Sequence, residues 1–273
     1  MPAVHKEALE AFEFIEPEWP APPSVRAGST TRRGGASHSP YDHLNLALRV
    51  GDDPDAVAEN RKRLGKWLHL PAEPLWMRQV HGTRVIEAER AEPDTVGDAC
   101  VARSSGRPCA ILSADCLPIL LCARDGGAIA AVHAGWRGLA AGVIENTVAA
   151  MRTQAREVIA WLGPGIGATA YEVGPEVRDA FVRRHREDVG AFVPTRPGHW
   201  TADLAGLARA RLSRCGVAAV HGGNRCTHSD PQRFYSFRRD GTTGRFATLI
   251  WIEAPASPPP GRRDPGLNRS APP

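Results

Sequence analysis

The sequence predicts an α/β fold with a mixed sheet in a single domain. Strand-like apolar runs alternate with helical segments, and one pair of runs is joined by a connection too short for a parallel crossover. The 273 residues are 42% hydrophobic and 23% charged, ordinary values for a globular chain that can bury a sizeable core. No internal repeat or mid-chain linker is visible, so one domain is the simplest interpretation.

Four segments are predicted to be helical. They are 56–70, 139–154, 175–186 and 201–214. The first has the clearest start, because Asp52 and Asp53 supply an acidic cap and Pro54 suits a first helical turn. The second carries Ala, Val and Ile at helical spacing, which is typical of a helix that packs on a core.

Apolar runs predict the strands between these helices. Two short strands are expected within 75–88, on either side of His81 and Gly82, followed by strands at 109–114, 118–123, 128–134, 158–163 and 245–253. The mixture of hairpins and strand–helix connections is what favours a mixed sheet over a purely parallel one.

The two ends differ from the middle in composition. Residues 1–22 end in proline-rich sequence, and residues 254–273 are rich in proline, arginine and serine. Such segments bury little apolar surface, so both are predicted to be disordered. The folded domain is expected over residues 23–253.

Charge and hydropathy exclude several partner classes. No apolar run approaches the roughly 20 residues that a membrane-spanning helix needs, and no secretory signal begins the chain. These features predict a cytoplasmic protein without membrane contact, whose six cysteines are free thiols or metal ligands. A net charge of +4 spread along the chain does not indicate nucleic-acid binding.

One predicted hairpin brings a thiol and an imidazole together. Asp125-Gly126-Gly127 separates two apolar runs, a pattern typical of a tight antiparallel turn. Counting back from that turn places Cys116 opposite His133, within about two residues. A thiolate and an imidazole are good ligands for zinc or copper, so this pair is a candidate metal site.

A tight catalytic metal site usually needs a third protein ligand. His81 lies between two strand-like runs and precedes Gly82, which permits a sharp turn. Spacing favours His81 over His228 only slightly. Arg137 lies close to the start of the predicted 139–154 helix, where it suits either anion binding or a surface ion pair.

Several of these segments resemble a known family. Three runs are similar to the laccase-domain family: QVHGTRV (79–85), ADCLPILL (114–121) and VHAGWRGLAAGV (132–143). The older name of this family is multicopper polyphenol oxidoreductase, and the family is now described as purine nucleoside phosphorylase. Further matches, including TTRRGGAS (30–37), GPGIGATAYEVGPEV (163–177) and CTHSDPQRFYSFRRDGTTGR (226–245), follow in collinear order from about residue 25 to 252.

The resemblance implies an α/β sandwich with helices outside and a catalytic zinc held by His81, Cys116 and His133. It implies phosphorolysis of adenosine, inosine, guanosine or methylthioadenosine to the base and ribose 1-phosphate. Adenosine deamination to inosine at the same site is also implied. Purine nucleosides and phosphate would then be the partners.

Phosphorolysis requires groups that hold phosphate beside C1′ of the nucleoside. Arginines and backbone N–H groups suit that task, so Arg32, Arg137, Ser236 and Arg238 are candidate substrate- and phosphate-binding residues. The glycine-rich loop 163–167 is an alternative anion cradle, although it lacks the GK[ST] of a P-loop and equally suits a tight turn.

Three other functions stay open. A copper-dependent polyphenol oxidase would use the same His₂Cys ligands, but the chain has no HxH pair, and neither internal methionine adjoins a proposed ligand. A metal-free hydrolase, including a peptidoglycan-editing one, would use Cys116 as nucleophile and His133 as base, with Asp115 orienting the histidine. For deamination, Asp115 is the nearest candidate to carry a proton to the leaving ammonia, but support of the site through hydrogen bonds is the favoured role, because adjacent strand residues point to opposite faces. A non-catalytic binding module is the third.

Overall fold

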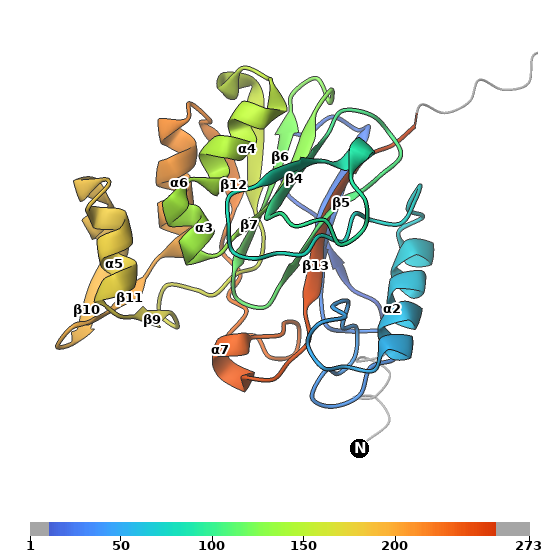
Figure 1. Cartoon of the computed structure of the whole chain (residues 1–273), viewed down its shortest axis with the longest axis horizontal. Coiled ribbons are helices and arrows are strands. Elements are labelled where there is room, and N and C mark those ends of the chain that lie inside the picture. Colours follow the sequence, from blue (N-terminus) through green and yellow to red (C-terminus); the bar gives the residue numbers. More distant parts are fainter. Residues whose placement is uncertain (1–10, 255–273) are drawn as a thin grey trace, which may run out of the picture.

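The computed structural model describes residues 11–254, and two stacked β-sheets form its body (Figure 1). The larger sheet has six strands, in the order β12 (Ala219–Gly222), β8 (Val158–Leu162), β6 (Leu117–Ala123), β7 (Ile129–Ala134), β4 (Ala99–Ala102) and β3 (Val85–Glu87). The outer pairs β12–β8 and β3–β4 are parallel, and the three inner pairs are antiparallel. The predicted mixed sheet is therefore confirmed.

The second sheet is antiparallel throughout and packs face to face on the first. Its order is β1 (Phe14–Ile15), β2 (Val25–Thr30), β13 (Phe246–Ile252) and β5 (Cys109–Ser113). Between the two sheets lies a cluster of buried side chains that includes Ile111, Leu120, Ile129 and Ile250. Burial of this apolar area from both sheets stabilises the sandwich.

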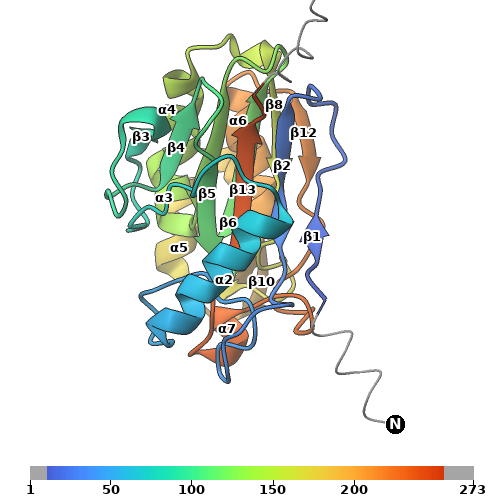
Figure 2. The same cartoon turned by 90° about the vertical axis from the view of Figure 1, so that its right-hand side faces the viewer.

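Helices cover the outer faces of the sandwich. On the six-stranded sheet lie α3 (Trp136–Ala141), α4 (Val143–Met151) and α6 (Leu204–Arg214), and on the four-stranded sheet lies α2 (Pro54–Trp67). Figure 2 shows α2 in front of β13 and β5, with the six-stranded sheet behind them. Asp53 caps α2 by accepting a hydrogen bond from Asp55 N at 3.0 Å, as its acidic start predicts. The expected sandwich with helices outside is confirmed.

Strand β6 shows why the central runs are apolar without interruption. Leu117, Ile119 and Leu121 face the helices, whereas Leu120 and Cys122 face the second sheet. Successive residues of a strand point to opposite faces, and here both faces are covered. A continuous apolar run is therefore what this position in the fold requires.

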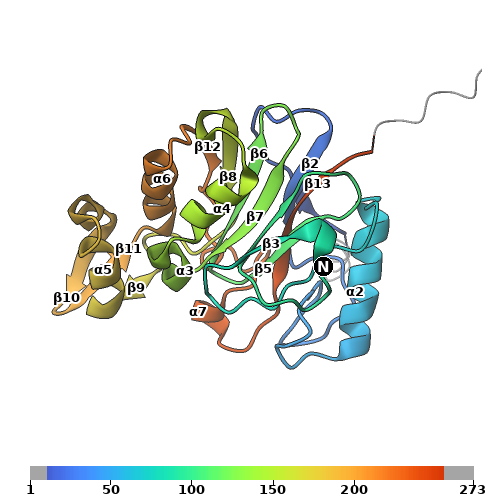
Figure 3. The ribbon, with the colours of Figure 1, turned by 45° about the horizontal axis from the view of Figure 1, so that its top comes forward.

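A smaller three-stranded sheet stands at one end of the molecule, beside α5 (Figures 1 and 3). It consists of β10 (Phe192–Arg196), β11 (His199–Ala202) and β9 (Glu172–Val173). The remaining helices of the molecule are α5 (Pro175–Val182) and α7 (Phe237–Asp240). Its 3₁₀ turns are η1 (Ala88–Arg90), η2 (Ala155–Glu157) and η3 (Arg186–Ala191). Within residues 11–254, no helix is both long and apolar enough to cross a membrane.

Predicted helices 56–70 and 175–186 end early, at Trp67 and Val182, and three other predicted elements differ more strongly in the structure. Within 75–88 only β3 is a strand, because residues 75 and 78 form isolated bridges and the chain turns at His81. The predicted helix 139–154 is two helices that meet at Gly142, whose φ of 106° ends α3. The predicted helix 201–214 starts only at Leu204, since residues 199–202 form β11.

The expectation of disorder over residues 1–22 is wrong for its second half. Phe14 and Ile15 pair with β2, and Phe12 stacks on Trp67 of α2 with ring centroids 4.5 Å apart. These aromatic side chains find apolar partners that a composition-based argument overlooks. Residues 1–10 and 255–273, which carry the rest of the expected disorder, lie outside the described residues.

Candidate metal centre and active-site pocket

The β6–β7 hairpin places Cys116 beside His133. In the antiparallel register Pro118 pairs with His133, so Cys116 lies two residues before the partner of His133, at the open end of the hairpin. The turn at residues 124–127 includes Gly126 in the left-handed region, with a φ of 76°. The predicted meeting of the two side chains is confirmed.

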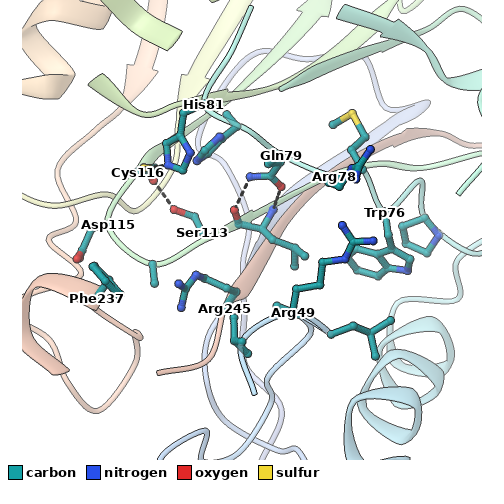
Figure 4. A pocket seen from close by; sticks show the side chains of 18 of the residues that line it. Arg49, Trp76, Arg78, Gln79, His81, Ser113, Asp115, Cys116, Phe237 and Arg245 are labelled. Atoms are coloured by element: carbon teal, nitrogen blue, oxygen red, sulfur yellow. Dashed lines mark hydrogen bonds between the residues drawn. The ribbon is translucent and has the colours of Figure 1, made fainter. Parts of the chain in front are cut away.

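His81 completes a group of three possible ligands. One ligand atom each from His81, Cys116 and His133 lies within 4.8 Å of the others, and within residues 11–254 this is the one such group. His81 Nε2 is 3.7 Å from Cys116 Sγ (Figure 4), and the imidazole rings of His81 and His133 are 4.8 Å apart between centroids. Of the two histidines that spacing leaves open, His81 and not His228 therefore joins the pair.

Asp98 holds both histidine-bearing segments in place. One carboxylate oxygen accepts hydrogen bonds from His133 Nδ1 at 2.9 Å and His81 N at 2.8 Å, and the other accepts from Gly82 N at 2.7 Å and Val80 N at 3.2 Å. The Asp98 side chain is fully buried. Because Nδ1 of His133 faces this carboxylate, Nε2 is the nitrogen left to ligate a cation.

The absence of a side chain at Gly135 lets the three groups approach. A Cβ atom at this position would lie 2.9 Å from Cys116 Sγ and 2.9 Å from His81 Cδ2. Gly138 is equally confined, because a Cβ there would lie 2.7 Å from Gly82 O. The small residues after His133 are therefore needed for the loop that carries His81 to pack against α3.

Electrostatics favour the thiolate form of Cys116. Burial raises the pKa of this thiol, but the charge of His133 and hydrogen bonds from His133 and His81 outweigh burial and lower the pKa to about 6. Burial lowers the pKa of His133, whereas Cys116 and Asp98 raise it to about 9. A thiolate is the form of cysteine that binds a metal cation, so the donor set fits a metal.

Asp115 supports the site instead of orienting His133. Its carboxylate accepts hydrogen bonds from Thr227 Oγ1 at 2.6 Å and from Arg238 N at 2.7 Å, which joins the chain before β6 to Thr227 and to α7. The Ser113 hydroxyl donates to the Cys116 carbonyl, which further fixes the turn. The histidine's carboxylate partner is Asp98, so the interpretation of Asp115 as the third member of a triad is wrong.

The three possible ligands line a pocket of about 880 Å³. Around the metal centre its walls are aromatic and basic, and they are formed by Asp115, Trp136, Arg137, Ile166, Tyr171, Phe237 and Arg238. Gln79, Leu112, Ser113 and Arg245 line the middle, as Figure 4 shows for the residues it labels. Apolar surfaces combined with a few polar groups are typical of a small-molecule site.

Two of the four predicted phosphate-binding residues reach this pocket. The Arg137 guanidinium stacks on Trp136 at 4.4 Å from the ring centroid, and Arg238 lies over Tyr171 while donating to the Glu172 carbonyl at 2.7 Å. Both arginines line the pocket wall near the metal centre.

Arg32 and Ser236 have other partners. Arg32 donates to the carbonyls of Asp42 and Pro231 at 2.7 and 3.2 Å, and buried Ser236 caps α7 by accepting from Arg239 N at 3.3 Å. Neither lines the pocket. Their side chains are already used to hold the chain around α7, so the geometry argues against phosphate binding by these two residues.

The glycine-rich loop 163–167 is a tight turn and not an anion cradle. Gly165 N donates to the Arg225 carbonyl, Ile166 N to the Asp115 carbonyl and Gly167 N to Cys226 Sγ. Its backbone donors are therefore used within the protein, although the Ile166 side chain reaches the pocket.

Sequence reasoning missed Asp98, Tyr171, Phe237 and Arg245. Asp98 immediately precedes the buried strand β4, and a carboxyl group beside an apolar run is a signal that could have drawn attention to it. Arg245 precedes β13 in the same way, and its guanidinium donates to the carbonyls of Thr243 and Gly244. Tyr171 lies in an irregular segment and Phe237 begins the four-residue helix α7, and neither carries such a signal.

Comparison with known proteins finds similar bacterial proteins. A purine nucleoside phosphorylase of Pseudomonas aeruginosa is 53% identical over 243 residues, covering 88% of this chain and 98% of the relative. One of Escherichia coli is 47% identical over 242 residues, covering 88% and 99%.

Solved structures agree on the fold. A crystal structure of a Neisseria meningitidis protein has a TM-score of 0.86 at 46% identity and covers 88% of this chain and 99% of its own. A Geobacillus stearothermophilus protein has a TM-score of 0.79 at 31% identity, with 85% and 93% covered. The family model described as multi-copper polyphenol oxidoreductase laccase matches residues 26–253. The chain therefore belongs to the multi-copper polyphenol oxidoreductase laccase family.

Proposed function

We propose that this chain is a zinc-dependent purine nucleoside phosphorylase. The observation that carries the proposal is the pocket in which two imidazoles and a thiol face arginine and aromatic side chains. The two bacterial relatives described above are named purine nucleoside phosphorylases, which supports the same activity here. The substrates would be adenosine, inosine, guanosine or methylthioadenosine, together with phosphate.

His81, Cys116 and His133 would hold the metal ion. Three protein ligands of this kind suit a catalytic zinc, which keeps a further coordination position open. When bound, the ion supplies Lewis acidity at one end of the pocket. Asp98 fixes the orientation of His133, and Gly135 leaves room for the other two ligands.

Zinc suits the site better than copper does. A multicopper oxidase needs several copper sites rich in histidine, whereas the described residues contain one group of three ligands. The His₂Cys set would also suit a single blue-copper centre, so metal content after purification without added metal distinguishes the two. Stoichiometric copper with phenol oxidation would replace the present proposal by a polyphenol oxidase.

Phosphorolysis places defined demands on the other side chains. A phosphate oxygen forms a bond to C1′ while the C1′–N9 bond breaks, and the base leaves with that electron pair and takes up a proton. Arg137 and Arg238 are the groups that would hold the phosphate, because guanidinium groups bind phosphate through paired hydrogen bonds. Trp136 and Phe237 offer apolar surface for the purine.

Deamination of adenosine to inosine and ammonia is proposed for the same pocket. This reaction adds water at C6 and requires a proton to reach the departing ammonia. Asp115 does not suit the transfer, because both of its carboxylate oxygens already accept hydrogen bonds. We therefore expect deamination to be the slower of the two reactions.

One observation favours a second candidate, a metal-free Cys–His hydrolase, which would include a peptidoglycan-editing enzyme. Cys116 has a pKa of about 6, and His133 is oriented by a buried carboxylate, as in a nucleophile–base–acid triad. The two candidates differ in the part that zinc plays. Zinc would block the nucleophile of a hydrolase, but it is required by the phosphorylase.

Product analysis tests the proposed function. The full chain loaded with zinc is incubated with adenosine, with and without phosphate, and adenine, ribose 1-phosphate and inosine are quantified. Adenine that forms only with phosphate supports phosphorolysis, and inosine that forms in both conditions supports deamination. The absence of both adenine and inosine would contradict both activities. His81→Ala should abolish turnover, whereas His199→Ala, on β11 and outside the pocket lining, should not.

A further inference from the structure

The pocket continues past the metal centre into a second compartment. We call this compartment the distal arginine site and define it by Arg49, Arg61, Trp76, Arg78 and Arg107, all of which line the pocket. Figure 4 shows Arg49, Trp76 and Arg78 on the side of the pocket away from Cys116 and His81. None of these five residues belongs to the proposed machinery for metal or phosphate at the other end.

The walls of the distal arginine site are held in place by hydrogen bonds. The Arg61 guanidinium stacks on Trp76 at 4.3 Å from the ring centroid and donates to the Leu46 carbonyl at 3.1 and 2.9 Å. Trp76 Nε1 donates to Glu73 at 3.1 Å, and Arg107 donates to the Ala91 carbonyl. Such fixed side chains lose little conformational freedom when a ligand binds.

Charge in this compartment is unbalanced. Four arginines line it against two carboxylates, Glu73 and Asp94, which leaves two surplus positive charges. Arg49 is paired with Asp94 at 2.5 Å. Among the described residues, Arg78 uses its backbone to bond Thr95 and Gly97, but its guanidinium has no carboxylate or carbonyl partner. An exposed guanidinium that faces a cavity without a partner is suited to an anion.

The size of the pocket indicates that a bare nucleoside does not use all of it. About 880 Å³ lies near the upper end of the range for small-molecule sites, roughly 300–1,000 Å³. A purine nucleoside and phosphate beside the metal centre would leave the distal compartment unfilled. Arg245 and Ser113 line the passage between the two ends, so the connection is polar and open to a charged substituent.

We propose that the distal arginine site binds a phosphoryl group carried by the substrate, so that the pocket takes purine nucleoside 5′-phosphates as well as nucleosides. This inference rests on the proposed function, because it assumes that the purine nucleoside occupies the metal end. Arg78 is the specificity-determining residue: it contacts the phosphoryl group and not the reacting atoms. Trp76 and Arg61 form the rigid wall behind it.

Calorimetric titration tests the proposal. The zinc-loaded full chain, in phosphate-free buffer, is titrated with adenosine, adenosine 5′-monophosphate and adenosine 5′-diphosphate. The phosphorylated ligands should bind about tenfold more tightly than adenosine, as one charge-assisted hydrogen bond predicts. Arg78→Ala should reduce affinity for the diphosphate about tenfold more than affinity for adenosine, and Arg78→Glu should reduce it further. Arg183→Ala, which removes an exposed arginine directly after α5, is the matched control.

Three results would overturn the inference. The first is equal affinity of the wild-type chain for all three ligands, and the second is an Arg78→Ala variant that weakens adenosine and the diphosphate alike or not at all. Diphosphate binding that is lost in His81→Ala but kept in Arg78→Ala would place the phosphoryl group at the metal centre and also contradict it. Failure of the proposed function would be seen separately, as absence of phosphate-dependent adenine release from adenosine.

Discussion

Asp98 joins two parts of the centre that the chain keeps far apart. Its carboxylate accepts four hydrogen bonds, one from the His133 ring and three from the backbone around His81. Removal of such a group leaves buried donors without partners and releases both histidines from their orientation. The effect of Asp98 on the metal is therefore indirect, through the geometry of its ligands.

We expect Asp98→Asn to weaken zinc affinity by about 10- to 100-fold, because the amide nitrogen replaces one accepting oxygen with a donor. Competition with a chromophoric chelator measures this affinity directly and does not depend on turnover. Asp179→Asn, an acidic residue on α5 away from the pocket, is the control. Unchanged zinc affinity in Asp98→Asn would show that the carboxylate does not position the ligands.

Gly135→Ala should also weaken zinc binding. The added Cβ would lie 2.9 Å from Cys116 Sγ and His81 Cδ2, so at least one ligand must move. Gly190→Ala adds the same atom where nothing lies within 4 Å and should leave zinc affinity unaltered. The same chelator competition compares the two variants, and equal affinities would contradict the steric argument.

The three ligands differ in how far sequence alone can place them. Cys116 and His133 follow from the hairpin, because a tight turn fixes the register of its strands. His81 depends on the family resemblance, since it lies 35 residues before Cys116 and no local rule relates the two. For Arg32 and Ser236 the prediction from residue type fails. Their side chains suit phosphate binding, but in the structure they form hydrogen bonds within the protein around α7.

At the scale of elements, Gly142 divides a stretch that periodicity predicts as one helix. Its φ of 106° ends α3 and lets α4 start in a new direction. Apolar spacing continues across the break, because both helices pack on the same face of the six-stranded sheet. Periodicity therefore predicts the buried face correctly but does not locate the change of direction.

Two glycine-to-alanine substitutions should have opposite effects on stability. Gly142→Ala should lower the free energy of unfolding by about 1–2 kcal/mol, because alanine in the left-handed region is strained. Gly65→Ala should raise it by about 0.5–1 kcal/mol, since Gly65 lies in α2 with open space around its Cα. Denaturant unfolding of both variants measures the difference, and a shift of the same sign in both would contradict the assignment.

Strand prediction succeeded for three strands that are buried on both faces but missed β4, which is also fully buried, because its four residues make too short an apolar run. β6, β7 and β8 are fully buried and read as continuous apolar runs. β9, β11 and β12 are short and partly exposed, so their mixed composition does not distinguish them from loops. The sandwich itself depends on pairings between distant segments such as β2 and β13, which local patterns do not specify.

At the scale of the whole molecule, metal removal separates the two candidate functions. Chelation followed by gel filtration should abolish phosphate-dependent adenine release, and added zinc should restore it. In the metal-free chain, iodoacetamide should modify Cys116 faster than Cys215, because burial raises the pKa of Cys215. Mass spectrometry of the labelled peptides measures both rates.

Zinc should protect Cys116 from iodoacetamide and leave labelling of Cys215 unchanged. Protection follows because a sulfur bound to a cation is no longer a free nucleophile. An enzyme that turns over normally after exhaustive chelation, and that loses activity on alkylation whether or not zinc is present, would instead be a cysteine hydrolase.

The β6–β7 hairpin also has a kinetic consequence. Hairpins of this kind form within about 1–10 μs, well before contacts between distant segments are established. Cys116 and His133 should therefore meet while the rest of the chain is still unfolded, and Asp98 and His81 should arrive only when β4 pairs with β7. A cation captured by the nascent chain at that early stage would hold the two strands in their native register and guide the later steps of assembly.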